Sequence, residues 1–165
     1  MNGSKKISWL IEAYGPIACG AATLLALWHL RNYLLPLMAE DRISVSNLFS
    51  AIFGWASIQT GCVYAIYGFI AGKTDGFIGE IRNTRSMKRY STYIKRAIFS
   101  GFILTLFSMP LIVWKFKVGA DDHNLFLAIA VWFSTFIWAF LSFARVAYIF
   151  GILIRIEDVK KIEGG

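Results

Sequence analysis

KTDGFIGEIRNTRSMKRYSTYIKR, residues 73–96, is the only long polar stretch in a sequence that is otherwise strongly apolar. It carries seven basic residues against two acidic ones, Asp75 and Glu80. Long apolar segments lie on both sides of it. Such a stretch is typical of a loop between two membrane-spanning helices, and it therefore sets the layout of the chain. The seven basic residues are Lys73, Arg82, Arg85, Lys88, Arg89, Lys95 and Arg96.

The composition indicates that lipid surrounds much of the chain. Apolar residues make up 57% of the 165 residues and charged residues 16%, whereas a soluble domain has about 25% charged residues. Cys19 and Cys62 fall within apolar segments, so we expect small buried residues and no disulfide. The sequence contains no Cys/His cluster, no HExxH motif and no nucleophile–base pair. We therefore expect no metal, no cofactor and no enzymatic activity.

Four apolar segments are long enough to cross a bilayer, which takes about 20 helical residues each. They show no period-two alternation, so we expect helices rather than strands. The predicted fold class is an all-α integral membrane protein with a single four-helix domain over residues 1–165. The four spans cover about 9–30, 48–71, 97–114 and 125–150, and a basic hairpin at 72–96 joins the second span to the third.

The lysine and arginine residues predict which ends of the spans lie in the cytoplasm. Two of them lie at the N-terminus, seven in residues 73–96 and three in the C-terminal tail, whereas each of the other two loops holds two. The positive-inside rule therefore places both termini and the basic hairpin in the cytoplasm. We expect an integral protein of a bacterial-type inner (plasma) membrane.

The basic hairpin is expected to form an amphipathic helix that runs into the third span, from about Glu80 to Trp114, with Asp75 available as a cap. At 100° per residue its arginines lie within about 60° of one another. The expected binding set is Arg82, Arg85, Lys88, Arg89, Lys95 and Arg96, with Met87, Tyr90, Ile94 and Ala97 on the other half. The expected partner is the anionic headgroups of the bilayer, and the alternative is an acidic cytosolic protein. Nucleic acid is not the expected partner, because no fold that reads bases is evident.

The second span carries small residues at successive spacings of four, three, four, four, three and four. One side of this helix is thus almost free of side chains, which lets membrane helices approach closely. A shorter set lies in the first span at Gly15, Ala18, Ala22 and Ala26. The simplest interpretation packs the two sets against each other within a protomer. The alternative packs the second span on its own copies, which makes a homo-oligomer. This small-residue stripe, for helix packing or pore lining, is Ser50, Gly54, Ser57, Gly61, Ala65, Gly68 and Gly72.

Two charged residues interrupt the spans, and both fall near predicted cytoplasmic ends. Arg145 lies about 20 residues, or ~30 Å, into the fourth span, and Glu12 lies a few residues into the first. Either the two form an ion pair, or Arg145 extends to the headgroups while Glu12 lies at the interface. Gln59 and Thr60, near the middle of the second span, are expected to form an interhelical hydrogen bond or to line a polar path.

Three functions are consistent with this pattern. The first is a homo-oligomeric pore or membrane-perturbing protein that is controlled through its basic hairpin. The second is a membrane sensor or scaffold that binds a cytosolic partner there. The third is a transporter subunit, although inverted repeats and a midplane polar site are missing. In layout alone the chain resembles small bacterial accessory or anti-phage defence membrane proteins, which implies a setting in antiviral defence.

Overall fold

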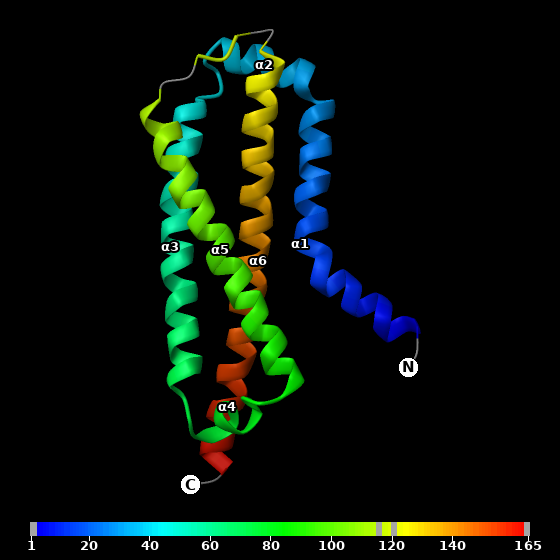
Figure 1. The fold of residues 1–165 in the computed structure, drawn as a ribbon, viewed down its shortest axis with the longest axis vertical. Coiled ribbons are helices and arrows are strands. Elements are labelled where there is room, and N and C mark those ends of the chain that lie inside the picture. The colour runs from blue at the N-terminus through cyan, green and yellow to red at the C-terminus, as the bar shows by residue number, and fades with distance from the viewer. Residues whose placement is uncertain (1–2, 115–116, 120–121, 164–165) are drawn as a thin grey trace.

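A computed structural model of the chain describes the backbone of residues 3–114, 117–119 and 122–163, and the side chains of residues 14–114, 117–119 and 122–156. Four long helices form the body of the molecule, and two short helices, α2 and α4, lie near its opposite ends (Figure 1). The helices are α1 (Gly3–His29), α2 (Arg31–Ala39), α3 (Val45–Gly72), α4 (Gly76–Ile81), α5 (Arg85–Val113) and α6 (His123–Glu163).

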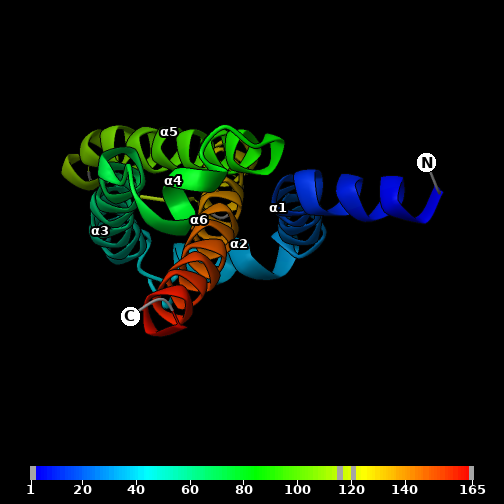
Figure 2. The same cartoon turned by 90° about the horizontal axis from the view of Figure 1, so that it is seen from below.

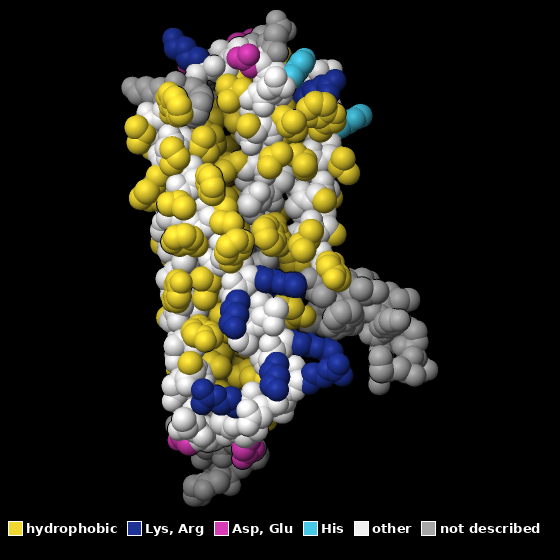
Figure 3. Space-filling view, in the orientation of Figure 1, with side chains coloured by type: hydrophobic (Ala, Val, Ile, Leu, Met, Phe, Trp, Pro, Cys, Tyr) yellow, Lys and Arg dark blue, Asp and Glu magenta, His cyan; other side chains and the backbone are white. Residues whose placement is uncertain are grey.

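Three of the helices, α3, α5 and α6 as far as Ile156, are long and apolar enough to cross a membrane. Large apolar side chains such as Ile58, Phe99 and Leu106 are exposed on them, and one face of the molecule shows a broad band of hydrophobic side chains (Figure 3). Lipid stabilises such a surface, whereas water does not. The chain is therefore a multi-pass helical membrane protein. The first predicted span corresponds to α1, whose side chains are described only from Tyr14 onward.

The long helices are arranged around α6. Helix α3 packs mainly on α5, and α1 packs mainly on α6, so that α1 and α3 lie on opposite sides of α6 (Figure 2). The interpretation that the small residues of α1 and α3 face each other within a protomer is therefore wrong. Helix α1 approaches α6 through Gly20, where an added β-carbon would lie 3.1 Å from the Ser134 carbonyl oxygen. Helix α1 also changes direction in its first half (Figure 1), where Pro16 removes a backbone donor.

A buried polar side chain joins three helices near the middle of the bundle. Gln59 is 1% exposed, and its Nε2 donates to the carbonyl oxygens of Ala97 on α5 at 3.5 Å and Ala139 on α6 at 3.4 Å. The expected interhelical hydrogen bond from Gln59 is thus present. Thr60 instead donates to Ala56 of its own helix at 2.7 Å. Among the residues whose side chains are described, Gln59 is enclosed, so it does not line an open polar path within the protomer.

The amphipathic start of α5 is confirmed, but its first residue is Arg85 rather than Glu80. The Thr84 hydroxyl accepts the N–H of Met87 at 3.3 Å and begins the helix. Asp75 instead precedes the separate short helix α4, and its side chain makes no capping hydrogen bond. The second span likewise begins earlier than expected, because Ser44 caps α3. The residues predicted on the half of this helix opposite the basic residues are all buried, namely Met87, Tyr90, Ile94 and Ala97.

The packing of α5 on α3 can be tested by substitution at Gly101, where the two helices approach each other closely. A β-carbon built at Gly101 of α5 would collide with the Oγ1 of Thr60 on α3. We expect Gly101→Ala to lower the free energy of unfolding in detergent by about 1–3 kcal/mol, and Thr60→Ala to restore most of that loss in the double variant. Gly151→Ala of α6 is the control, because a β-carbon there meets nothing within 4 Å. Equal losses at Gly101 and Gly151 would contradict the described contact.

Candidate functional site

The small-residue stripe of α3 faces away from the rest of the protomer. The buried residues of α3 point toward α5 and α6, and at 100° per residue the stripe lies about 170° from them. All seven stripe residues are exposed. A β-carbon added at Gly54, Gly61, Gly68 or Gly72 would meet nothing within 4 Å. Within the described part of the chain, the stripe is thus a bare helix surface along the whole length of α3.

The polar atoms of the stripe are compatible with lipid or with a neighbouring helix. Ser50 and Ser57 donate their hydroxyl hydrogens to carbonyl oxygens of α3 itself, at 3.1 Å and 2.9 Å. Their oxygens keep lone pairs that a second helix or water can approach. The stripe therefore has small side chains and is only weakly polar, as is typical of surfaces through which membrane helices pack closely.

The basic face lies toward the end of the molecule at which α3 ends and α5 begins. Its six predicted binding residues are all exposed, and Lys and Arg side chains gather below the hydrophobic band on one face (Figure 3). Five of the six lie on α5, whereas Arg82 lies in the turn between α4 and α5. The interpretation that Arg82 shares one helix with the others is therefore wrong, because Thr84 begins a new helix after it.

Arg82 links the basic face to the end of the stripe. Its Nη2 donates to the carbonyl oxygen of Ala71 at 3.2 Å, one residue before the last stripe residue, Gly72. Carbonyl groups in the last turn of a helix lack intrahelical partners and carry partial negative charge. A guanidinium is a suitable partner for them. The position of Arg82 is thus coupled to the last turn of α3.

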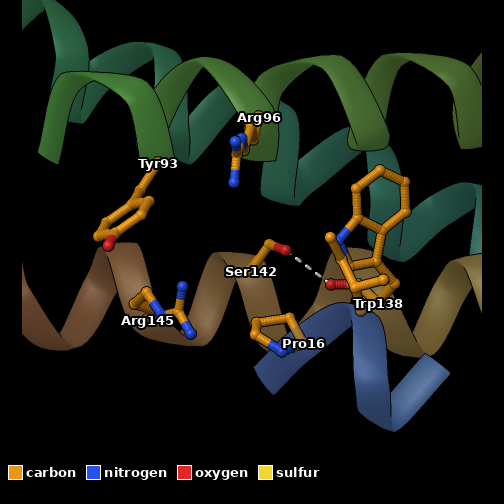
Figure 4. Close-up of a pocket in the computed structure, with 7 residues that line it drawn as sticks. Pro16, Tyr93, Arg96, Trp138, Ser142 and Arg145 are labelled. Carbon is orange, nitrogen blue, oxygen red and sulfur yellow. Dashed lines mark hydrogen bonds between the residues drawn. The ribbon is translucent and has the colours of Figure 1, made fainter. Parts of the chain in front are cut away.

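Arg145, the predicted intramembrane charge of the fourth span, lies in a crevice where α1, α5 and α6 meet. Its guanidinium carbon lies 5.0 Å from the ring centroid of Tyr93 on α5. A β-carbon on Gly15 of α1 would lie 3.8 Å from one of its nitrogens. Arg96 reaches into the same crevice from α5 (Figure 4). The side chain of Glu12 lies outside the described residues, so its pairing with Arg145 stays a prediction.

The remaining candidate ligands are scattered. Within residues 14–114, 117–119 and 122–156, no group of three His, Cys, Asp or Glu side chains is placed to hold a metal ion. Cys19 and Cys62 are both exposed free thiols. The expectation that they are buried is therefore wrong, because both lie on outward sides of their helices.

The fold and these surfaces define a class, the multi-pass helical membrane proteins, with a bare packing face and a basic end. No protein-family model matches the chain, and neither a curated protein nor a solved structure is detectably similar to it.

Three structural residues of these surfaces were missed from the sequence. Ser44 and Thr84 are the caps that set the starts of α3 and α5, and a Ser or Thr before an apolar periodic segment is the signal that identifies such caps. Tyr93 is the aromatic partner of Arg145. No sequence signal identifies this pair, because it depends on how α5 crosses α6.

The cap at Thr84 gives a test of how the basic face is held. Thr84→Ala removes the acceptor for the Met87 N–H, which we expect to cost about 1 kcal/mol of local stability. Hydrogen exchange of the first-turn amides of α5 should therefore speed up several-fold. Thr92→Ala, which removes a hydroxyl that bonds within the exposed side of the same helix, should leave those amides unchanged. Unchanged exchange in Thr84→Ala would contradict the assigned cap.

Proposed function

We propose that this protein is a homo-oligomer whose protomers pack through the α3 stripe around a common axis, and that the assembly forms a pore or otherwise perturbs the bilayer. One observation carries the proposal. The stripe is exposed over its whole length, and its four glycines have open space where a β-carbon would stand. Such a surface is suited to a close helix–helix contact that the protomer itself does not supply.

The axis between copies is also the better place for a conducting path. The interior of the protomer is filled by apolar side chains in two clusters, and Gln59 between them is enclosed. A ring of α3 helices would instead present small side chains and the hydroxyl oxygens of Ser50 and Ser57 to the axis. Small residues there leave room for water while they also permit contact between neighbouring helices.

In the proposed membrane arrangement α1 crosses the bilayer in addition to α3, α5 and α6, which gives four spans, and both termini lie in the cytoplasm. This orientation places the basic face on the cytoplasmic side, as the positive-inside rule expects, and it is consistent with a protein of a bacterial-type inner membrane.

The control element of the proposed pore is the contact from Arg82 to Ala71. An anion that draws Arg82 away would release the last turn of α3, where the stripe ends. The defence setting stays a prediction.

The assembly is tested with Gly61→Leu, which fills the middle of the stripe. We expect the unaltered protein to run as a discrete homo-oligomer in mild detergent and to release ions from vesicles. Gly61→Leu should shift the mass to the protomer and reduce flux by tenfold or more, because a leucine there holds two helices apart. Gly151→Leu is the matched control, since this glycine of α6 is exposed and also has open space at its β-carbon.

Other results would favour the other functions. If the unaltered protein is a monomer, that result would contradict the proposed oligomer and would favour the third function, a transporter subunit. Stoichiometric capture of an acidic cytosolic protein, lost when Arg85 and Arg89 are replaced by Glu but kept in Gly61→Leu, would favour a scaffold instead. The exposure of the basic face is the observation that keeps this second function under consideration.

A further inference from the structure

The crevice between α1, α5 and α6 gathers positive charge at one level of the bundle. It is narrow, with space for about one water-sized group. Two arginines from different helices line it, Arg96 from α5 and Arg145 from α6. Figure 4 shows Arg96 pointing from α5 toward α6, where Arg145 lies. Its lining residues are Pro16, Ile17, Tyr93, Arg96, Trp138, Ser142 and Arg145.

The Arg145 side chain is held in place rather than extended freely. Its guanidinium stacks near the ring of Tyr93, at 5.0 Å from the centroid, and the backbone of α1 at Gly15 passes beside it. Cation–π contact and packing on both sides restrict its rotamers. A guanidinium fixed in this way presents its N–H fork to a ligand at little further cost in conformational entropy.

The described lining offers donors to a ligand but no negative charge. The residues that line the crevice include no Asp or Glu. The Ser142 hydroxyl donates a hydrogen bond to the Trp138 carbonyl oxygen at 2.8 Å. Two guanidiniums that share a crevice repel each other, and an anion placed between them relieves that repulsion and accepts hydrogen bonds from both.

The depth of the crevice identifies the source of that anion. Arg145 lies 20 residues after Leu125, near the start of α6, which is about 30 Å along the helix. This equals the hydrocarbon thickness of a bilayer. Arg145 therefore lies at the boundary between the hydrocarbon core and the headgroup region of the bilayer. The anions that are concentrated at this boundary are lipid phosphates.

An apolar groove continues from the crevice toward the middle of the bundle. It lies between α1 and α6 and shares Ile17 and Trp138 with the crevice. The other residues that line it are Gly20, Ala21, Leu24, Val131, Ser134 and Thr135. A lipid whose phosphate meets the two arginines would place an acyl chain along this groove, which a free phosphate ion would not use.

We propose that an anionic phospholipid places one phosphate oxygen in this crevice, where Arg96 and Arg145 donate to it. The rest of the phosphate lies outside the crevice, and one acyl chain lies in the groove between α1 and α6. The bound lipid joins α1, α5 and α6 at the level of the headgroups. This site does not depend on how the protomers assemble, because none of its residues belongs to the α3 stripe.

The proposal is tested by native mass spectrometry of the whole protein in detergent, titrated with phosphatidylglycerol and with phosphatidylcholine. We expect about one retained phosphatidylglycerol per protomer and little phosphatidylcholine. Arg96→Gln and Arg145→Gln should each weaken the binding about tenfold or more, because each removes a charge-assisted contact. Ala21→Phe, which fills the groove, should weaken it as well. Arg155→Gln is the control, an exposed arginine of α6 that does not line the crevice.

Three results would overturn the proposal. Unchanged binding in Arg96→Gln would do so, and this exposed residue can be replaced without disturbing the core. Displacement of the lipid by millimolar inorganic phosphate, together with unchanged binding in Ala21→Phe, would show that a free anion is the ligand. An unaltered protein that retains no lipid, while Glu12→Gln retains one, would show that Glu12 already occupies the two arginines.

Discussion

Helices surrounded by hydrocarbon gain little by burying apolar side chains against one another, so their association depends on how closely their backbones can approach. This constraint explains the described contacts. Helix α3 meets α5 closely at Gly101, and α1 meets α6 closely at Gly20. The bundle keeps a third surface of the same kind, the small-residue stripe of α3, on its outside. We propose that this outside surface packs on a second copy of the chain.

The basic end of the molecule is arranged by local hydrogen bonds as well as by the burial of apolar residues such as Ile78 and Met87. The Thr84 hydroxyl caps the start of α5 after the turn at Arg82, and Arg82 donates to the Ala71 carbonyl oxygen in the last turn of α3. Charge at this end is thus connected with the end of the stripe through one side chain. Arg96 and Arg145 belong to a different arrangement, a crevice that is lined by α1, α5 and α6.

The sequence predicted the helical class, the amphipathic start of α5 and the hydrogen bond of Gln59, because composition, helical period and burial of an isolated polar group are local properties. It did not predict which helices are neighbours. Small residues in α1 and α3 suggest a pair, but nothing in either segment records that α6 lies between them. The caps at Ser44 and Thr84 were missed for a different reason, because the apolar content of a segment locates a span but does not identify its first residue. The contact of Arg145 with Tyr93 depends on a crossing of helices that no local pattern encodes.

The central claim, that α3 of one protomer packs on α3 of another, is tested most directly by disulfide cross-linking in native membranes. Cys19 and Cys62 would first be replaced by alanine, and a single cysteine then introduced as Gly54→Cys, Gly61→Cys or, on α6, Gly151→Cys. A disulfide requires α-carbons within about 7 Å. The account predicts covalent dimers at Gly54 and Gly61 and none at Gly151. Equal cross-linking at all three positions, or none at the two positions of α3, would contradict it.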